Sequence, residues 1–368
     1  MPVRVAILGA SGAVGGALAA HLLRTRLLRP GDALQLVGHG AGGSEGRLLA
    51  VGIDLQDAFD DAHVAIELVP DIGDARADIV VVAAGATVSE RTPTRRDVGA
   101  ANAGLFERIS SECAARLPRA LFVVVSNPVE LAVELVARAV DRRRVVGMGA
   151  QQDSLRFARA VAADLGLSRH EVLASVVGEH GQAMAPLWRS VELVGRARYH
   201  THLLAALEGL RARAGAAAPL PERVAALREE VWSLMGEERI ADAYQATRRA
   251  LPDARIFVEP FVTAHCVHST PNATANATLE VIAAALARDG RLVHGQVRLA
   301  AGDAAFGVEG VCGVPLTLDR EEGWVAASPG WLDADARAAM AASAVSIRAF
   351  LDQFASAGAP LLPRGGSG

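Results

Sequence analysis

The sequence predicts an α/β fold, with a doubly wound parallel sheet in its N-terminal half and an α+β arrangement in its C-terminal half. Two observations lead to this prediction. Short aliphatic and β-branched runs alternate with longer segments of helical periodicity over residues 3–140, which is typical of parallel strands covered by helices on both faces. Beyond residue 150, consecutive helices and consecutive strands replace this alternation.

The hydrophobic pattern places each element in turn. In the first half, the expected strands cover residues 3–8, 34–37, 64–68, 78–83 and 121–125, and the expected helices cover 17–28, 48–59, 97–117 and 129–140. In the second half, we expect strands at 172–177, 292–300 and 311–318, and helices from 151, at 205–213, 222–249, 274–288 and 333–354, with a loop at 258–272. The chain then divides into domains 1–150 and 151–357, followed by a disordered tail at 358–368.

Composition excludes several classes of protein. The net charge of −4 comes without a basic stripe, which argues against a nucleic-acid partner, and no apolar run reaches the length of a membrane span. The three cysteines, Cys113, Cys266 and Cys312, are far apart, so we expect reduced thiols in a cytoplasmic protein. His265 and His268 flank Cys266 but match no metal-ligand pattern, and no metal site is expected. All 37 basic residues are arginine, so any anion clamp uses arginine, histidine or backbone amides.

A glycine-rich turn follows the first expected strand and opens the first helix. Gly9, Gly12 and Gly15 suit a tight turn, a close approach to a pyrophosphate, and close packing of helix on strand. The helix N-terminus offers free N–H groups to phosphates. This pattern predicts a Rossmann-type dinucleotide site. Ser11, Ala13 and Val14 lie between these glycines and are also expected to contact the cofactor.

The second strand bears on the choice of dinucleotide. It ends in Val37-Gly38-His39-Gly40 and lacks the acid that usually holds the ribose 2′-hydroxyl of NAD. Gly38 and His39 are candidate cofactor contacts, and His39 and Arg47 offer positive partners to a 2′-phosphate. The pattern favours NADP, with NAD left open, because His39 also fits an ordinary solvated loop.

Three further segments suggest chemistry. Asp153 and Arg156 are three residues apart, so they share one face of a helix. His180 lies in a glycine-flanked turn after a strand, and its type of side chain suits proton transfer near neutral pH. Asn127 follows another strand and precedes Pro128.

Taken together, the motifs resemble the malate/lactate dehydrogenase family. The resemblance covers residues 3–195 and 269–352, and the stretch after the histidine is similar to that of archaeal-type malate dehydrogenases. The matching segments are Gly9–Gly16, Ala84-Gly85-Ala86, Ser126-Asn127-Pro128, Asp153-x-x-Arg156, Gly178-Glu179-His180-Gly181, Met184–Trp188 and Gly310–Pro315.

The resemblance implies an NAD(P)-dependent oxidoreductase that interconverts a small 2-hydroxy acid and its 2-oxo acid, with a Rossmann domain followed by a substrate domain. It implies proton transfer by His180, orientation of that ring by Asp153, and carboxylate binding by Arg156, with Asn127 near the reacting oxygen. Arg95, seven residues before Asn102, corresponds to the family's lid arginine, which polarises the carbonyl. The further cofactor contacts implied are Ala84, Gly85, Asn102 and Ser126.

The sequence departs from the family in two places. In the family, one lid position selects the substrate, and here that position falls on Ser89. The loop is one residue longer than usual, and Arg91 in the same loop could bind a second carboxylate instead. Residues 196–268 match the family poorly. His268, at the end of this segment, and Thr270, just beyond it, are candidate pocket residues. Because of these departures malate does not follow directly from the motifs. The resemblance keeps malate and oxaloacetate as the first expectation, with an atypical 2-oxo acid or a catalytically silent dinucleotide sensor as alternatives. The family also implies a homodimer or homotetramer.

Overall fold

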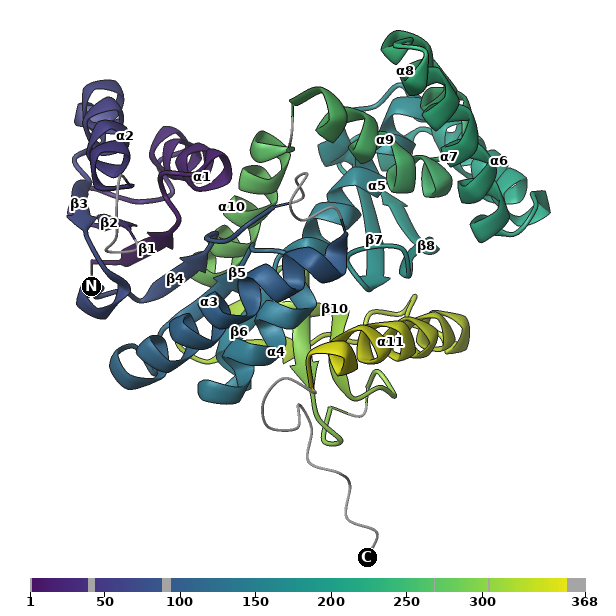
Figure 1. Ribbon diagram of the computed structural model, residues 1–368. Coiled ribbons are helices and arrows are strands. Elements are labelled where there is room, and N and C mark those ends of the chain that lie inside the picture. Colours follow the sequence, from purple (N-terminus) through teal and green to yellow (C-terminus); the bar gives the residue numbers. More distant parts are fainter. Residues whose placement is uncertain (1, 39–43, 88–93, 268, 304, 356–368) are drawn as a thin grey trace, which may run out of the picture.

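A computed structural model describes residues 2–38, 44–87, 94–267, 269–303 and 305–355 of the chain (Figure 1). Its strands are β1 (Arg4–Leu8), β2 (Ala33–Val37), β3 (Ala65–Val69), β4 (Ile79–Val82), β5 (Leu121–Val124), β6 (Val145–Gly147), β7 (Val172–Gly178), β8 (Met184–Leu193), β9 (Val293–Leu299), β10 (Gly310–Asp319) and β11 (Gly323–Ala326). Its α-helices are α1 (Ala13–Arg24), α2 (Ser44–Phe59), α3 (Arg95–Arg116), α4 (Val129–Ala139), α5 (Gly149–Leu165), α6 (Thr201–Ala216), α7 (Leu220–Gly236), α8 (Ile240–Arg249), α9 (Pro252–Val267), α10 (Pro271–Ala287) and α11 (Ala334–Ala355).

The N-terminal half contains the predicted parallel sheet. The strand order β3-β2-β1-β4-β5-β6 is that of a doubly wound dinucleotide fold, and each neighbouring pair is parallel. Val5, for example, pairs with Leu34 on one side and Ile79 on the other. The order reverses between β1 and β4, so the carboxyl ends of these strands define the crevice in which such sheets bind ligands.

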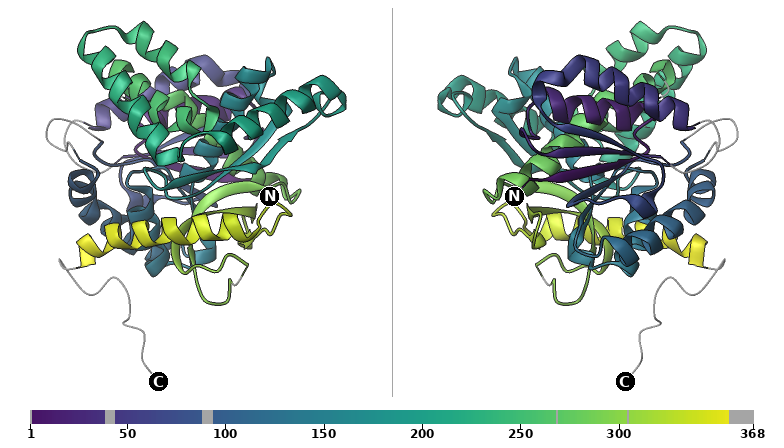
Figure 2. Two further views of the ribbon diagram at one scale, coloured as in Figure 1. Left: turned by 90° about the vertical axis from the view of Figure 1, so that its right-hand side faces the viewer. Right: turned by 90° about the vertical axis from the view of Figure 1, so that its left-hand side faces the viewer.

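Alternation along the strands builds one core on each face of this sheet. Val5 and Ile7 of β1 pack in a cluster with α1 and α10, whereas Ala6 and Leu8 pack in a cluster with α3, α4 and α11. The side views show α11 running along the face opposite to α1 and α2 (Figure 2). Both faces are thus covered, which is why the central strands β4 and β5, and β1 after Arg4, are apolar and buried throughout.

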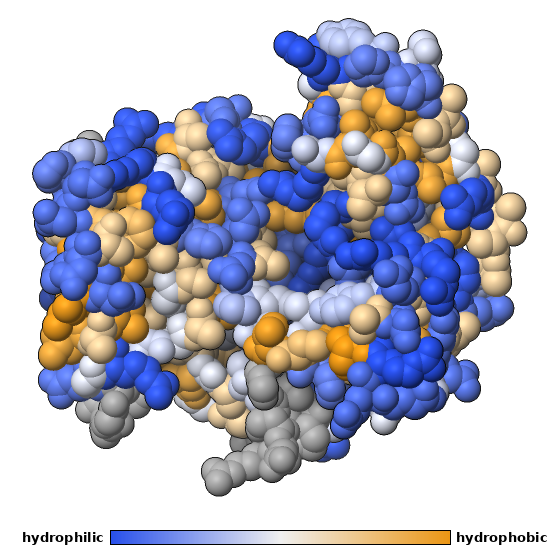
Figure 3. All heavy atoms as spheres, turned by 90° about the horizontal axis from the view of Figure 1, so that it is seen from above, coloured by the Kyte–Doolittle hydropathy of each residue, from blue (hydrophilic) through white to orange (hydrophobic). Residues whose placement is uncertain are grey.

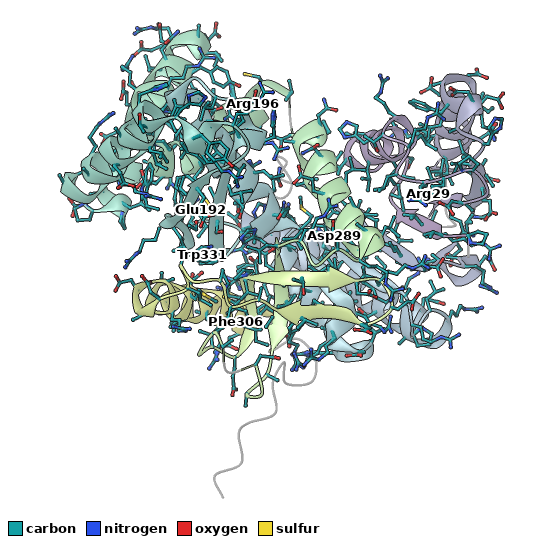
Figure 4. All side chains as sticks on the ribbon, turned by 180° about the vertical axis from the view of Figure 1, so that it is seen from behind. Arg29, Glu192, Arg196, Asp289, Phe306 and Trp331 are labelled. Carbon is teal, nitrogen blue, oxygen red and sulfur yellow. The ribbon has the colours of Figure 1, made fainter. Side chains whose placement is uncertain are left out.

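The sheet continues into the C-terminal half with antiparallel strands. β9 pairs antiparallel with β6 and β10, and β10 joins the β7–β8 hairpin. Seen from behind, Phe306 lies in the loop between β9 and β10, and Trp331 lies between β11 and α11 (Figure 4). The described residues therefore form one 11-stranded sheet, and the predicted α/β class with an α+β C-terminal half is confirmed.

Several predicted elements differ from the structure. The first helix begins at Ala13, four residues earlier than expected, because the end of the glycine-rich segment is itself helical. The helix expected over residues 222–249 is two helices, α7 and α8, separated where Glu238 adopts a left-handed φ of 59°. The loop expected at 258–272 is mostly α9, whose Ile256, Phe257 and Val262 are buried in a cluster with α5.

Within the part of the chain that the structure describes, no helix has the length and apolarity needed to cross a membrane.

Two neighbouring glycines of α1 allow a matched stability test. A Cβ on Gly15 would lie 2.3 Å from the Gly9 carbonyl oxygen, whereas a Cβ on Gly16 meets nothing closer than 3.5 Å. Gly15→Ala should therefore destabilise the protein by about 1–3 kcal/mol through overpacking. Gly16→Ala should be neutral or stabilising by up to about 1 kcal/mol, because alanine favours helix. Chemical denaturation of both variants measures the difference, and equal free energies of unfolding would contradict this packing.

Candidate active site

The candidate residues from the first half gather at the carboxyl edge of the parallel sheet. Gly9 follows β1, Gly38 follows β2, Ala84 and Gly85 follow β4, and Ser126 follows β5. These are the central and neighbouring strands of the sheet, so the four turns lie side by side. Seen from above, the surface is hollowed between two lobes, and hydrophilic side chains surround the hollow (Figure 3).

The turn between β1 and α1 fits a dinucleotide phosphate. Gly9 has a φ of 85°, and a Cβ there would lie 2.7 Å from the Ala83 carbonyl oxygen, so only glycine fits the turn. Gly12 caps α1 without a side-chain hydrogen bond, and the first turn of the helix contains no acid. Gly12 and Ala13 are exposed. The free N–H groups and the positive end of the helix dipole thus face solvent, as phosphate binding requires.

Asn102 and Ser126 hold the neighbouring turns in place. The Asn102 side chain accepts a hydrogen bond from Ala86 N (2.7 Å) and donates to the carbonyl oxygens of Ala86 (2.9 Å) and Asn127 (2.8 Å). Ser126 Oγ lies 2.6 Å from the Ala84 carbonyl oxygen. Both side chains are buried. They therefore fix the backbone after β4 and β5, while the Asn127 residue is exposed at this edge.

His180, Asp153 and Arg156 meet at one buried carboxylate. His180 Nδ1 lies 2.6 Å from Asp153 Oδ2, and Arg156 Nη1 donates to Asp153 Oδ1 over 3.0 Å. The Asp153 side chain is 3% exposed, whereas the His180 ring is 17% exposed. With Nδ1 bonded to the carboxylate, Nε2 is the ring nitrogen left for a ligand. Gly149 makes room for this ring, because a Cβ there would lie 2.5 Å from His180 Cγ.

The same contacts keep Asp153 ionised. Burial alone would raise the pKa of its carboxyl group. The charges of His180 and Arg156, and the hydrogen bonds that both donate, outweigh burial and hold that pKa below its ordinary value of 3.8. A carboxylate in this state stabilises a protonated imidazole and holds the neutral ring with its proton on Nδ1.

Arg95 lies near His180 but is bound to carboxylates. Its Nη2 donates to Glu130 Oε2 over 2.5 Å, its Nη1 donates to Glu179, and its guanidinium lies 4.3 Å from the Phe350 ring centroid. Glu130 also accepts a hydrogen bond from the His180 backbone N–H, at 2.6 Å. Arg95 therefore balances two buried acids beside the histidine turn, and its guanidinium would have to leave one of them to reach a substrate.

Glu130 and Glu179 are the site residues that the sequence reasoning missed. Both are buried, although acids are rarely buried without a partner. A signal was present in each case. Glu130 is an acid within the apolar run that opens α4, and Glu179 stands next to the predicted histidine.

Thr270 lies beside the guanidinium of Arg156. Arg156 Nη2 and Thr270 Oγ1 are 3.4 Å apart, and Gln152 Nε2 donates to the neighbouring Thr274 Oγ1 over 3.0 Å. The structure thus brings Thr270 to Arg156, the arginine that the sequence predicts to bind a carboxylate. The other predicted contacts, His39, Ser89, Arg91 and His268, lie outside the described residues.

The cysteines carry no sign of a reactive site. Cys113 and Cys312 are buried, which raises the pKa of both thiols to about 12, and Cys266 is exposed. In the described ranges, no group of three or more His, Cys, Asp or Glu side chains could hold a metal ion.

Comparisons with known proteins agree with this geometry. Residues 3–147 match the family model of the lactate/malate dehydrogenase NAD-binding domain. A malate dehydrogenase of Methanosphaera stadtmanae is 26% identical over 197 residues, and an L-2-hydroxycarboxylate dehydrogenase (NAD(P)(+)) of Methanocaldococcus jannaschii is 30% identical over 200 residues. Each match spans 52% of this chain, and it covers 61% of the first relative and 62% of the second.

The fold extends the similarity beyond the matched domain. The structure of the malate dehydrogenase from Aeropyrum pernix superposes with a TM-score of 0.70 at 22% identity, covering 95% of this chain and 97% of that one. The similarity to a known family therefore lies in residues 3–147, which resemble the NAD-binding domain of lactate/malate dehydrogenases.

Proposed function

We propose that the protein is an NAD(P)-dependent 2-hydroxy acid dehydrogenase. One observation carries the proposal: a single buried carboxylate, Asp153, holds both a histidine suited to proton transfer and an arginine suited to carboxylate binding. A 2-hydroxy acid needs both groups at this spacing, because its carboxylate is attached to the carbon that reacts. The dinucleotide-binding turn at the sheet edge supports the same reaction class.

The proposed reaction balances as 2-oxo acid plus NAD(P)H plus one proton giving 2-hydroxy acid plus NAD(P)⁺. When bound, the nicotinamide supplies or accepts the hydride at C2 of the acid. His180 Nε2 gives the proton to the carbonyl oxygen in reduction and takes it back in oxidation. Asp153 stabilises the imidazolium form, and Arg156 binds the carboxylate as a two-pronged donor.

We assign orienting roles to Asn127 and Arg95. Asn127 is exposed where β5 ends, which supports a role as hydrogen-bond donor to the reacting oxygen or to the nicotinamide. Arg95 adds positive charge beside the histidine turn, and it could stabilise charge on the substrate oxygen if substrate binding draws it away from Glu130 or Glu179. In this proposal, residues 1–150 bind the dinucleotide and residues 151–357 bind most of the acid.

His180→Asn should lower kcat for reduction of a 2-oxo acid by about 10²–10⁴-fold, the usual contribution of a general acid or base. Affinity for the dinucleotide should stay within a few-fold of the wild type, because His180 lies outside the glycine-rich turn. Absorbance at 340 nm gives the rates, and fluorescence titration gives the dinucleotide Kd. Near-normal kcat in this variant would refute the role of His180.

Asp153→Asn should lower stability in a pH-dependent way. The lowered pKa of Asp153 means that its carboxylate stabilises the fold above its ordinary pKa of 3.8, and that this stabilisation is lost as pH falls through the lowered value. The variant should therefore be less stable than the wild type at pH 7, by up to about 3–5 kcal/mol. The gap should close in strong acid. Urea denaturation across pH measures the gap, and a gap independent of pH would contradict the ion pairing.

Arg156→Lys should lower kcat/KM for the 2-oxo acid by roughly 10²-fold, because lysine keeps the charge but not the planar two-pronged donor. Arg169→Lys is a matched control, since Arg169 forms its own ion pair with Glu280 at 3.0 Å. The control should leave kcat/KM within about threefold of the wild type. Equal effects of both changes would show that Arg156 does not bind the carboxylate.

We also propose that the enzyme prefers NADP. Support comes from the absence of an acid between Val37 and Gly43, and from the exposed Arg47 in the first turns of α2. Arg47→Ala should raise KM for NADPH by about 10–100-fold, the equivalent of one charged hydrogen bond, and leave KM for NADH nearly unchanged. Arg26→Ala, which breaks an exposed pair with Asp61, is the control. A wild-type preference for NADH, or equal effects of Arg47→Ala on both cofactors, would overturn this preference.

A further inference from the structure

A pocket of about 310 Å³ opens beside Arg156. The carboxylate-binding face supplies Arg156 and Thr270, and α9 forms the opposite wall with Ile256, Pro260, Thr263 and Val267. Arg156 is therefore shared by the pocket and the His180–Asp153 site. A 2-oxo acid whose carboxylate lies on Arg156 would have its side chain close to this space.

The wall formed by α9 is held rigidly against α5. Arg255 of α9 is buried and donates to Asp164 Oδ1 over 2.8 Å and to the Ala160 carbonyl oxygen over 3.3 Å. At the start of α9, Asp253 accepts hydrogen bonds from Arg223 (2.7 Å) and from Trp188 Nε1 (3.0 Å). These buried contacts tie α9 to three other elements, α5, α7 and β8, so the pocket is present before any ligand binds.

The charges in this pocket are already paired. Besides Arg156, the charged residues that line it are Arg159 and Glu259, and Arg159 Nη2 donates to Glu259 Oε1 over 2.5 Å. Glu259 thus neutralises the cation that a second carboxylate would need, and its own charge would repel such a group. The rest of the α9 wall is mainly apolar, which favours an uncharged side chain.

We propose that this pocket binds the side chain of the 2-oxo acid and selects substrates with a bulky apolar side chain over dicarboxylates and over pyruvate. The inference rests on the proposed dehydrogenase function and names its substrate class. The volume supports it, since 310 Å³ lies within the range of roughly 300–1,000 Å³ that is typical of small-molecule pockets. The methyl group of pyruvate would leave most of that space unfilled.

The first test compares 4-methyl-2-oxopentanoate, 2-oxoglutarate, pyruvate and oxaloacetate with both reduced cofactors. The first two acids are similar in length, and beyond the C3 methylene that they share, the first carries an isopropyl group and the second a carboxymethyl group. We expect kcat/KM for 4-methyl-2-oxopentanoate to exceed that of each other acid by at least about tenfold, within the range by which hydrophobic pockets discriminate.

The second test releases the paired arginine. Glu259→Gln keeps the size of the side chain but leaves Arg159 without its counter-ion. The ratio of kcat/KM for 2-oxoglutarate to that for 4-methyl-2-oxopentanoate should then rise by at least about tenfold. Glu230→Gln is the matched control, because it breaks an exposed pair with Arg249 (2.9 Å), and Glu230 does not line this pocket. The control should leave the ratio unchanged.

The outcomes separate the two proposals. If oxaloacetate or pyruvate is reduced with the highest kcat/KM, or if Glu259→Gln acts like Glu230→Gln, the inference about the pocket is wrong while the dehydrogenase function stands. If no acid in a broad 2-oxo acid panel oxidises either cofactor, the proposed function fails and this inference fails with it.

Discussion

The site depends on the buried carboxylate of Asp153. One of its oxygens holds the His180 ring and the other holds the Arg156 guanidinium, so a single side chain fixes the distance between the two candidate functional groups. Burial of this charge is tolerated because both partners donate to it. Loss of either partner would leave a desolvated carboxylate, so the local fold and the proposed chemistry have the same requirement.

The sheet explains how distant segments of the chain converge on this carboxylate. The turns after β1, β2, β4 and β5 lie at one edge because parallel strands end together. The β7–β8 hairpin joins the same sheet through β10, which brings the histidine turn next to α4 and α5. Glu130 of α4 accepts a hydrogen bond from the His180 backbone and pairs with Arg95 of α3. These contacts hold the N-terminal ends of α3 and α4 against the histidine turn.

Local patterns in the sequence were sufficient for part of this arrangement. The parallel half follows from alternation of apolar strands and amphipathic helices, and the glycine-rich turn follows from steric limits that involve only neighbouring strands. The meeting of Asp153 with Arg156 follows from helical spacing. The partners of Arg95 could not be predicted, because they depend on tertiary contacts between segments 35 and 84 residues apart. The helical state of α9 was also missed, because it depends on burial of Ile256, Phe257 and Val262 in the cluster that α9 shares with α5, even though Pro260 lies inside the helix.

Transfer of deuterium tests the central claim most directly. The protein would be incubated with a 2-oxo acid and with the reduced dinucleotide, NADH or NADPH, deuterated at the transferable C4 position, and the acid would be analysed by mass spectrometry. The account predicts that the wild type forms a 2-hydroxy acid that carries one deuterium at C2. In His180→Asn, the rate of formation of this product should be lower by orders of magnitude. Tight binding of the reduced dinucleotide with no deuterated product from a broad panel of 2-oxo acids would contradict it.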